Sequence, residues 1–204
     1  MKKLIFILMA LLLALNSVAC GQEKGTENMK SSAKTDSVAA PSETKKNGKA
    51  LVVYFSASGN TAKVAGTLAS AIGADIRELK PAQPYTSHDL DYNTPGTRAT
   101  VEQKDDAARP QLAGAIGDLK QYDTIYIGYP IWWGIAPRIM YTFVESADLS
   151  GKKVVPFCTS GGGGMGASGE SLAAAARGRG NWVHGREFSA GASASQLKAW
   201  AEKL

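Results

Sequence analysis

Short apolar runs alternate with amphipathic segments along the chain after residue 47. Apolar and β-branched runs predict strands over residues 50–55, 75–80, 124–129, 154–159 and 182–188. Apolar residues at helical spacing predict helices over residues 99–108, 138–146, 168–177 and 195–204, and one more that carries Val64, Leu68 and Ile72 and ends at Gly73. Strands that alternate with helices indicate an α/β fold with a parallel sheet covered on both faces. Ligands of such sheets bind at the carboxyl ends of the strands, which directs attention to the loops that follow them.

The first 19 residues have the pattern of a secretory signal peptide. Lys2 and Lys3 precede a run of twelve apolar residues, 4–15. That run has the length of the apolar core of a signal peptide and is too short to span a bilayer comfortably. The pattern predicts that the protein leaves the cytoplasm.

Cys20 follows small residues in a sequence that resembles the lipobox of bacterial lipoproteins, although Ser17 stands where leucine is usual. Cleavage before Cys20 would leave a lipidated N-terminus, and its acyl chains would anchor the protein in a membrane. The alternative is an ordinary signal peptide cut after Ala19, which leaves Cys20 as a free thiol. We interpret residues 20–47 as the lipidated cysteine followed by a disordered linker, because few of them are hydrophobic.

The loop after the first strand, residues 56–61, offers hydroxyl groups, one glycine and the N-terminus of a helix. Backbone N–H groups and the helix dipole bind anions at such a terminus without any lysine or arginine. A P-loop is excluded because Gly48-Lys49 is followed by Ala50 rather than by serine or threonine. Serine, glycine, asparagine and threonine are also common helix caps, so simple capping remains an alternative.

Two further loops follow strands. Residues 129–137 contain adjacent tryptophans between prolines, and large aromatic side chains in a loop need either a cover or a flat ligand. The alternative is that both tryptophans cap the core. Residues 159–168 contain a glycine run that lets backbone approach a flat or charged group. This run also fits a dinucleotide motif with Glu187 at a suitable distance, which is disfavoured because too little chain follows for a nucleotide half-domain.

Together the three loops resemble those of flavodoxins of the short-chain group, and the resemblance spans residues 49–204. Ser-Ala-Ser-Gly-Asn-Thr at 56–61 matches the phosphate loop of that family. Tyr-Pro-Ile-Trp-Trp-Gly at 129–134 matches its first flavin-flanking loop, and residues 159–166 resemble the second. The resemblance implies that residues 48–204 form a single flavodoxin-like domain, with a five-stranded doubly wound sheet of order 2-1-3-4-5 that binds FMN at its edge.

The resemblance also implies three groups of FMN contacts. Side chains or amides of the first loop would hold the phosphate, namely Ser56, Ala57, Ser58, Gly59, Asn60 and Thr61. The second loop would flank the isoalloxazine with Pro130, Ile131, Trp132, Trp133 and Gly134, one tryptophan stacking and the other packing inward. The third would line the opposite side and the pyrimidine edge with Thr159, Ser160, Gly161, Gly162, Gly163, Gly164, Met165 and Gly166.

We therefore predict an FMN-binding electron carrier, held outside the cytoplasm by its lipid anchor, whose partner is an unidentified redox protein or small-molecule electron acceptor. The alternatives are an FMN-dependent NAD(P)H:quinone or nitro-compound reductase and a flavin-binding module without turnover. Whether the protein is an enzyme is left open by these residues.

Composition and charge limit the number of domains and the classes of partner that the chain can have. The chain has 204 residues, 44% of them hydrophobic, which suits one soluble domain. The net charge of +5 includes Lys2 and Lys3, so the mature chain carries about +3. This mild surplus does not predict nucleic-acid binding. It also departs from typical flavodoxins, which are strongly acidic, and that departure argues against a very low potential and the usual reductase partners.

Several residues that could carry other chemistry are interpreted as structural. His88 and His184 have no acid or nucleophile spaced around them, and neither belongs to a metal-binding cluster. Cys158 near the end of an apolar strand is expected to be a buried small hydrophobic residue. Asp105 and Asp106 lie in a polar stretch typical of solvated surface. No catalytic residue and no metal site are predicted.

Overall fold

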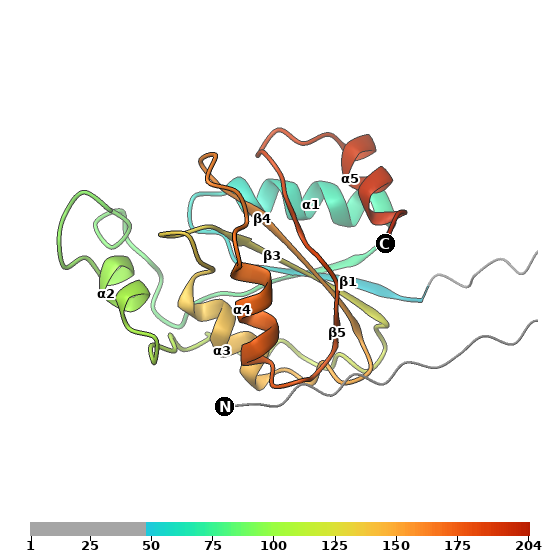
Figure 1. The fold of residues 1–204 in the computed structure, drawn as a ribbon, viewed down its shortest axis with the longest axis horizontal. Helices are drawn as coiled ribbons and strands as arrows, with labels where there is room; N and C mark the ends of the chain where they lie inside the picture. Colours follow the sequence, from blue (N-terminus) through green and yellow to red (C-terminus); the bar gives the residue numbers. More distant parts are fainter. Residues whose placement is uncertain (1–47) are drawn as a thin grey trace, which may run out of the picture. The chain divides into compact units, whose positions relative to one another are not determined.

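A parallel sheet with helices on both faces forms the part of the chain that the computed structural model describes, residues 48–204 (Figure 1). The strands are β1 (Ala50–Tyr54), β2 (Asp75–Glu78), β3 (Thr124–Pro130), β4 (Lys153–Thr159), β5 (Asn181–Trp182) and β6 (Arg186–Glu187). The helices are α1 (Asn60–Ile72), α2 (Arg98–Lys104), α3 (Arg138–Ser146), α4 (Ser168–Ala175) and α5 (Ala194–Ala201). The predicted signal peptide, Cys20 and linker lie outside the described residues.

The strand order confirms the predicted 2-1-3-4-5 sheet. Neighbouring strands follow the order β2-β1-β3-β4-β5, every pair is parallel, and β6 pairs with β4 as well. β1, β3 and β4 occupy the centre, and their carboxyl ends therefore meet at one edge. Among the helices described, none is long and apolar enough to cross a membrane.

The fifth strand differs from the continuous strand predicted over residues 182–188. Lys153 pairs with Asn181 and Phe157 pairs with Arg186, so the fifth strand contains one residue more than β4 between the two pairings. Pro156 lies in this interval of β4 and has no N–H to donate to the ladder. The extra residue forms a bulge that divides the strand into β5 and β6. Periodicity alone does not reveal such an insertion.

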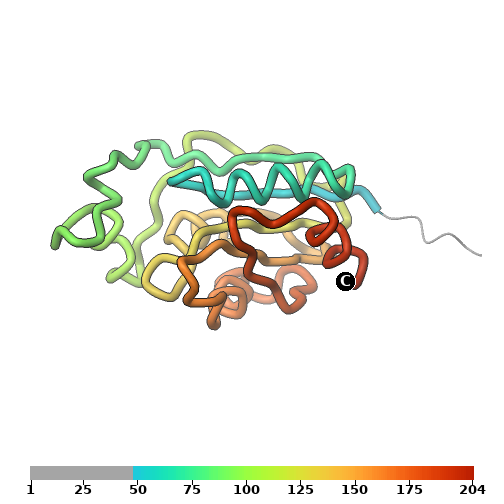
Figure 2. The backbone as a smooth tube through the Cα atoms, turned by 90° about the horizontal axis from the view of Figure 1, so that it is seen from above, coloured from blue at the N-terminus to red at the C-terminus, as the bar shows by residue number. Residues whose placement is uncertain are grey.

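Side chains of the central strands alternate between two cores. Val52 packs with α1 and α5, which lie side by side on one face, as Figure 2 shows. Leu51 and Val53 point to the opposite face, where α3 and α4 cover the sheet. Burial of both faces explains why the sequences of these strands are continuous apolar runs.

The segment between β2 and β3 extends past the carboxyl ends of the strands and carries α2 (Figures 1 and 2). The prediction of a helix over residues 99–108 is too long, because α2 ends at Lys104. Asp105 has an extended backbone, and its carboxylate accepts a hydrogen bond of 2.8 Å from the N–H of Ala107. This local side-chain bond competes with continuation of the helix.

We expect Gly128→Ala to destabilise the sheet. A Cβ at Gly128 in β3 would lie 2.3 Å from the Phe157 ring, so the substitution overpacks the core. We expect the free energy of unfolding to fall by about 1–3 kcal/mol, measured by urea denaturation. Gly66→Ala in α1 is the matched control, because no described atom lies within 4 Å of its Cβ position and alanine favours helix. Equal urea midpoints for Gly128→Ala and the parent would contradict this packing.

Candidate functional site

Three loops leave the carboxyl ends of β1, β3 and β4 and contact one another directly. The buried hydroxyl groups of Thr61 and Thr159 are 2.8 Å apart and share a hydrogen bond. The N–H of Ile131 donates to the carbonyl oxygen of Thr159 over 2.8 Å. A Cβ on Gly166 would lie 3.6 Å from the carbonyl oxygen of Gly134. The residues singled out from the sequence are therefore brought together at one edge of the sheet.

The exposure of these residues divides them into a surface set and a supporting set. Exposed are Ser58, Gly59, Asn60, Trp133, Gly134, Gly161, Gly162, Gly163 and Gly166. Buried or half-buried are Ser56, Ala57, Thr61, Pro130, Ile131, Trp132, Thr159, Ser160, Gly164 and Met165.

The first loop ends at the N-terminus of α1, where Gly59 has a left-handed backbone (φ 87°). No side chain among residues 48–204 caps this terminus. The Ser56 hydroxyl instead accepts a hydrogen bond of 3.1 Å from the N–H of Gly59, within the loop itself. The capping alternative holds only for Gly59, which occupies the N-cap position without a side-chain hydrogen bond. A helix of 13 residues with an uncapped, exposed N-terminus has the donors and the dipole that bind an anion.

The second loop is a tight turn with a strained residue at its tip. Trp132 and Ile135 exchange backbone hydrogen bonds of 2.9 and 3.1 Å, and Trp133 and Gly134 lie between them. Both central residues are left-handed, with φ 48° at Trp133 and φ 80° at Gly134, as in a type I′ turn. Glycine adopts this conformation freely, whereas a bulky residue such as tryptophan is strained there.

The two tryptophans differ in environment. The Trp132 ring packs edge-on against Phe55 and Tyr85, with ring centroids 5.6 and 5.4 Å apart. Trp133 is 50% exposed at the tip of the turn. The alternative that both tryptophans cap the core is therefore wrong, and the exposed ring is the one available to a flat ligand. The contribution of Tyr85 was missed because it belongs to no motif.

The third loop is organised by Ser160. Its hydroxyl accepts a hydrogen bond of 3.0 Å from the N–H of Gly162 and donates one to the carboxylate of Glu187. Gly162 and Gly164 have left-handed backbones. No described atom lies within 4 Å of the Cβ position of any residue from Gly161 to Gly164. The loop thus presents bare backbone outward, and Glu187 supports it from β6.

Two titratable groups beneath the loops, Cys158 and Tyr129, are held neutral. Cys158 is fully buried, as expected from the sequence, and burial raises the pKa of its thiol to about 12. Burial likewise raises the pKa of Tyr129, whose hydroxyl lies 3.1 Å from that of Ser168. Both groups stay protonated at neutral pH, and residues 56–61, 129–137 and 159–168 contain no charged side chain. An anion at this edge would be held by backbone N–H groups and hydroxyls.

The remaining candidates lie outside the site. His88 and His184 are exposed, and the nearest acid to His184 is Glu170 at 3.8 Å. Asp105 and Asp106 are exposed as predicted, although Asp106 also pairs with the buried Arg138. Among residues 48–204, no group of three His, Cys, Asp or Glu side chains could hold a metal ion.

One cavity of the described chain lies away from the three loops. A cavity of about 460 Å³ is lined by Leu112, Ile116, Phe143 and Lys152, beside the C-terminal end of α3 and the start of β4. The loop edge itself presents exposed backbone and one exposed indole. Such a surface suits a planar ligand that lies along it.

Comparisons with known proteins agree with this geometry. The model of a family described as flavodoxin matches residues 49–204. No curated protein matches the chain. A candidate flavoprotein from Bacteroides eggerthii is 44% identical, with a TM-score of 0.73 over 78% of this chain and 98% of that one. One from Bacteroides uniformis is also 44% identical, with a TM-score of 0.72 over 77% and 99%. A flavoprotein from Lactobacillus acidophilus, solved in complex with FMN, shares the fold at 24% identity, with a TM-score of 0.59 over 76% and 99%.

Strain at Trp133 can be tested by comparing two truncations. Trp133→Ala and Trp133→Gly remove the same exposed ring, but only glycine relieves the left-handed backbone. We expect the free energy of unfolding of the ligand-free protein to be about 1 kcal/mol higher for Trp133→Gly than for Trp133→Ala. Urea denaturation measures both. An alanine variant at least as stable as the glycine variant would show that residue 133 is not held in this conformation.

Proposed function

Because the chain belongs to the flavodoxin family, we propose that it binds FMN at the three loops that leave β1, β3 and β4, and that it transfers electrons. The observation that carries this proposal is one surface that combines an uncapped helix N-terminus, an exposed indole and a bare glycine loop. These are the three features needed by a ligand with a phosphate and a planar ring.

The phosphate would be bound at the N-terminus of α1. The first-turn N–H groups and the partial positive charge of the helix would balance its charge, since residues 56–61 contain no cation. Ser58 and Asn60 are exposed beside these N–H groups and can add hydrogen bonds. The bond between Thr61 and Thr159 fixes this loop against the glycine loop.

The ring would be held between the tip of the turn and the glycine loop. The Trp133 indole would cover one face and exclude water from it. The backbone from Gly161 to Gly164 would approach the other side, because no Cβ atoms stand in the way. When bound, FMN supplies one- and two-electron chemistry, and the protein contributes orientation, solvent exclusion and electrostatics.

The electron partner is proposed to be a redox protein or a small-molecule acceptor. The loops are uncharged, and an aromatic side chain is half exposed among them. If the protein is instead a reductase, these features favour a neutral acceptor such as a quinone. Steady oxidation of NAD(P)H in the presence of a quinone would distinguish that reductase from an electron carrier.

The FMN proposal predicts that the phosphate dominates affinity. We expect the chain from residue 21 to 204 to bind FMN about 100-fold more tightly than riboflavin, measured by quenching of flavin fluorescence. Thr61→Val should weaken FMN binding about tenfold, because it breaks the bond to Thr159. Thr67→Val on the same helix is the matched control, since within residues 48–204 its hydroxyl bonds only to the carbonyl of Lys63. Equal affinities for FMN and riboflavin would contradict the phosphate site.

We further propose that the mature chain is a lipoprotein anchored through Cys20 outside the cytoplasm. The support is the sequence pattern of residues 1–20. In a bacterium that processes lipoproteins, we expect the full chain in the membrane fraction, with the mass of a lipidated N-terminus. Cys20→Ser should lose this modification and leave that fraction. An unmodified parent chain cut after Ala19 would support an ordinary signal peptide instead.

A further inference from the structure

Gln103 is a buried polar residue on α2 that contacts the tryptophan turn at both of its ends. Its side-chain N–H₂ donates to the carbonyl oxygens of Trp132 and Ala136, over 3.1 and 3.3 Å. Its side-chain oxygen accepts a hydrogen bond of 3.1 Å from the N–H of Arg138. Gln103 is only 6% exposed, so these backbone groups replace its contacts with water. One carboxamide thus spans the whole turn.

The contacts fall where the turn needs support. The carbonyl of Trp132 also accepts from the N–H of Ile135, which closes the turn around left-handed Trp133. A strained residue persists only when its surroundings over-determine its conformation. The two ends of the turn are held by Gln103, and the tip between them carries the exposed indole. Loss of this carboxamide would therefore loosen the left-handed conformation of the turn, in addition to weakening its contact with α2.

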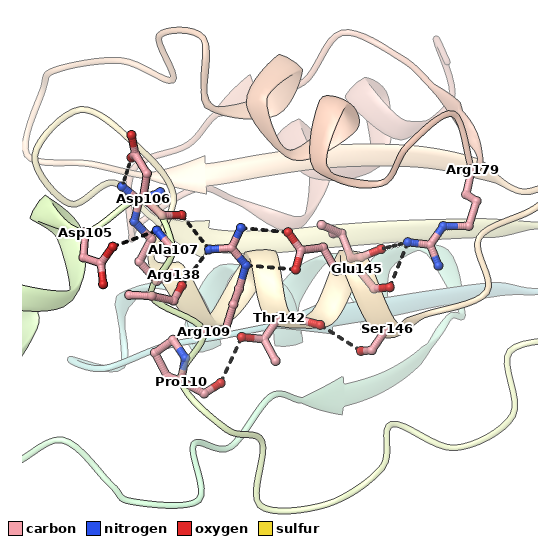
Figure 3. A network of polar contacts seen from close by, with 12 residues as sticks. Asp105, Asp106, Ala107, Arg109, Pro110, Arg138, Thr142, Glu145, Ser146 and Arg179 are labelled. Carbon is pink, nitrogen blue, oxygen red and sulfur yellow. Dashed lines mark hydrogen bonds and ion pairs between the residues drawn. The ribbon is translucent and has the colours of Figure 1, made fainter.

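Gln103 is itself fixed, because the chain around it is tied to α3. The Arg138 guanidinium donates to the backbone carbonyl of Gln103 over 3.0 Å and pairs with Asp106. Figure 3 shows how Arg109 faces Glu145 with two parallel hydrogen bonds, of 2.9 and 2.8 Å. Bidentate pairs of this kind restrict geometry as well as adding energy. The carboxamide is thus presented to the turn from a well-anchored segment.

We propose that Gln103 is a positioning residue for the flavin site: it holds the Trp132–Ala136 turn in the strained conformation that presents Trp133 to the ring. This inference rests on the proposed function and extends it to the segment between β2 and β3. It predicts that FMN affinity depends on a side chain that lies on α2, outside the three loops.

Two variants and one control test this role. Gln103→Leu removes all three hydrogen bonds at similar side-chain size, and Gln103→Glu keeps the acceptor for Arg138 while replacing the donor. Tyr122→Phe is the control, because it removes bonds to Asp75 and Arg77 at the amino end of β3, away from the site. Urea denaturation measures how far each substitution destabilises the fold, and Gln103→Glu keeps the test open if Gln103→Leu does not fold.

The readouts are the FMN dissociation constant, the visible absorption maxima of the bound flavin, and hydrogen exchange of residues 131–137 without FMN. Both Gln103 variants should raise the dissociation constant about tenfold, shift the maxima and speed exchange in the turn. Tyr122→Phe should leave all three readouts unchanged. The proposal is overturned if both Gln103 variants bind FMN within about twofold of the parent with unchanged spectra, or if Tyr122→Phe has the same effect.

Failure of the proposed function gives a different result. A folded parent chain that binds no FMN would contradict the FMN assignment. The hydrogen-exchange experiment would then test only whether Gln103 stabilises the turn. Faster hydrogen exchange of residues 131–137 in the Gln103 variants would support the conclusion that the Gln103 side chain stabilises the turn. Unchanged exchange would overturn it.

Discussion

Parallel pairing of β1 with β3 and of β3 with β4 is the constraint on which the site depends. It forces the three loops that follow these strands to one edge, where the buried hydroxyls of Thr61 and Thr159 join the first loop to the third. Ile131 joins the second loop to the third through a backbone bond. Each loop then contributes a different property to one open surface: anion-binding amides, an aromatic ring and bare backbone.

The two adjacent tryptophans of the second loop have different structural roles. Trp132 contributes to the core with Phe55 and Tyr85, whereas Trp133 is half exposed on a left-handed backbone. Strain of this kind is stored where the surroundings hold it, and Gln103 supplies part of that hold from α2. A segment that extends past the sheet is therefore connected to the edge where the ligand would lie.

Most of the sheet and all three loops could be predicted from the sequence, because buried parallel strands leave continuous apolar runs and the loops carry recognisable motifs. The bulge opposite Pro156 could not, since an inserted residue leaves the apolar pattern intact. The end of α2 had a signal in Asp105, a residue that often ends helices by bonding to nearby N–H groups. The sequence carries no signal for the role of Gln103, because its hydrogen-bond partners are backbone groups distant in sequence.

The central claim is that one planar ligand with a phosphate binds across all three loops. Its most direct test is the change in backbone amide NMR shifts when FMN is added to the chain from residue 21 to 204. The account predicts that the largest changes fall in residues 56–61, 130–134 and 159–166. Changes confined to the residues around the cavity at Leu112 and Phe143, or no changes in a folded protein, would contradict it.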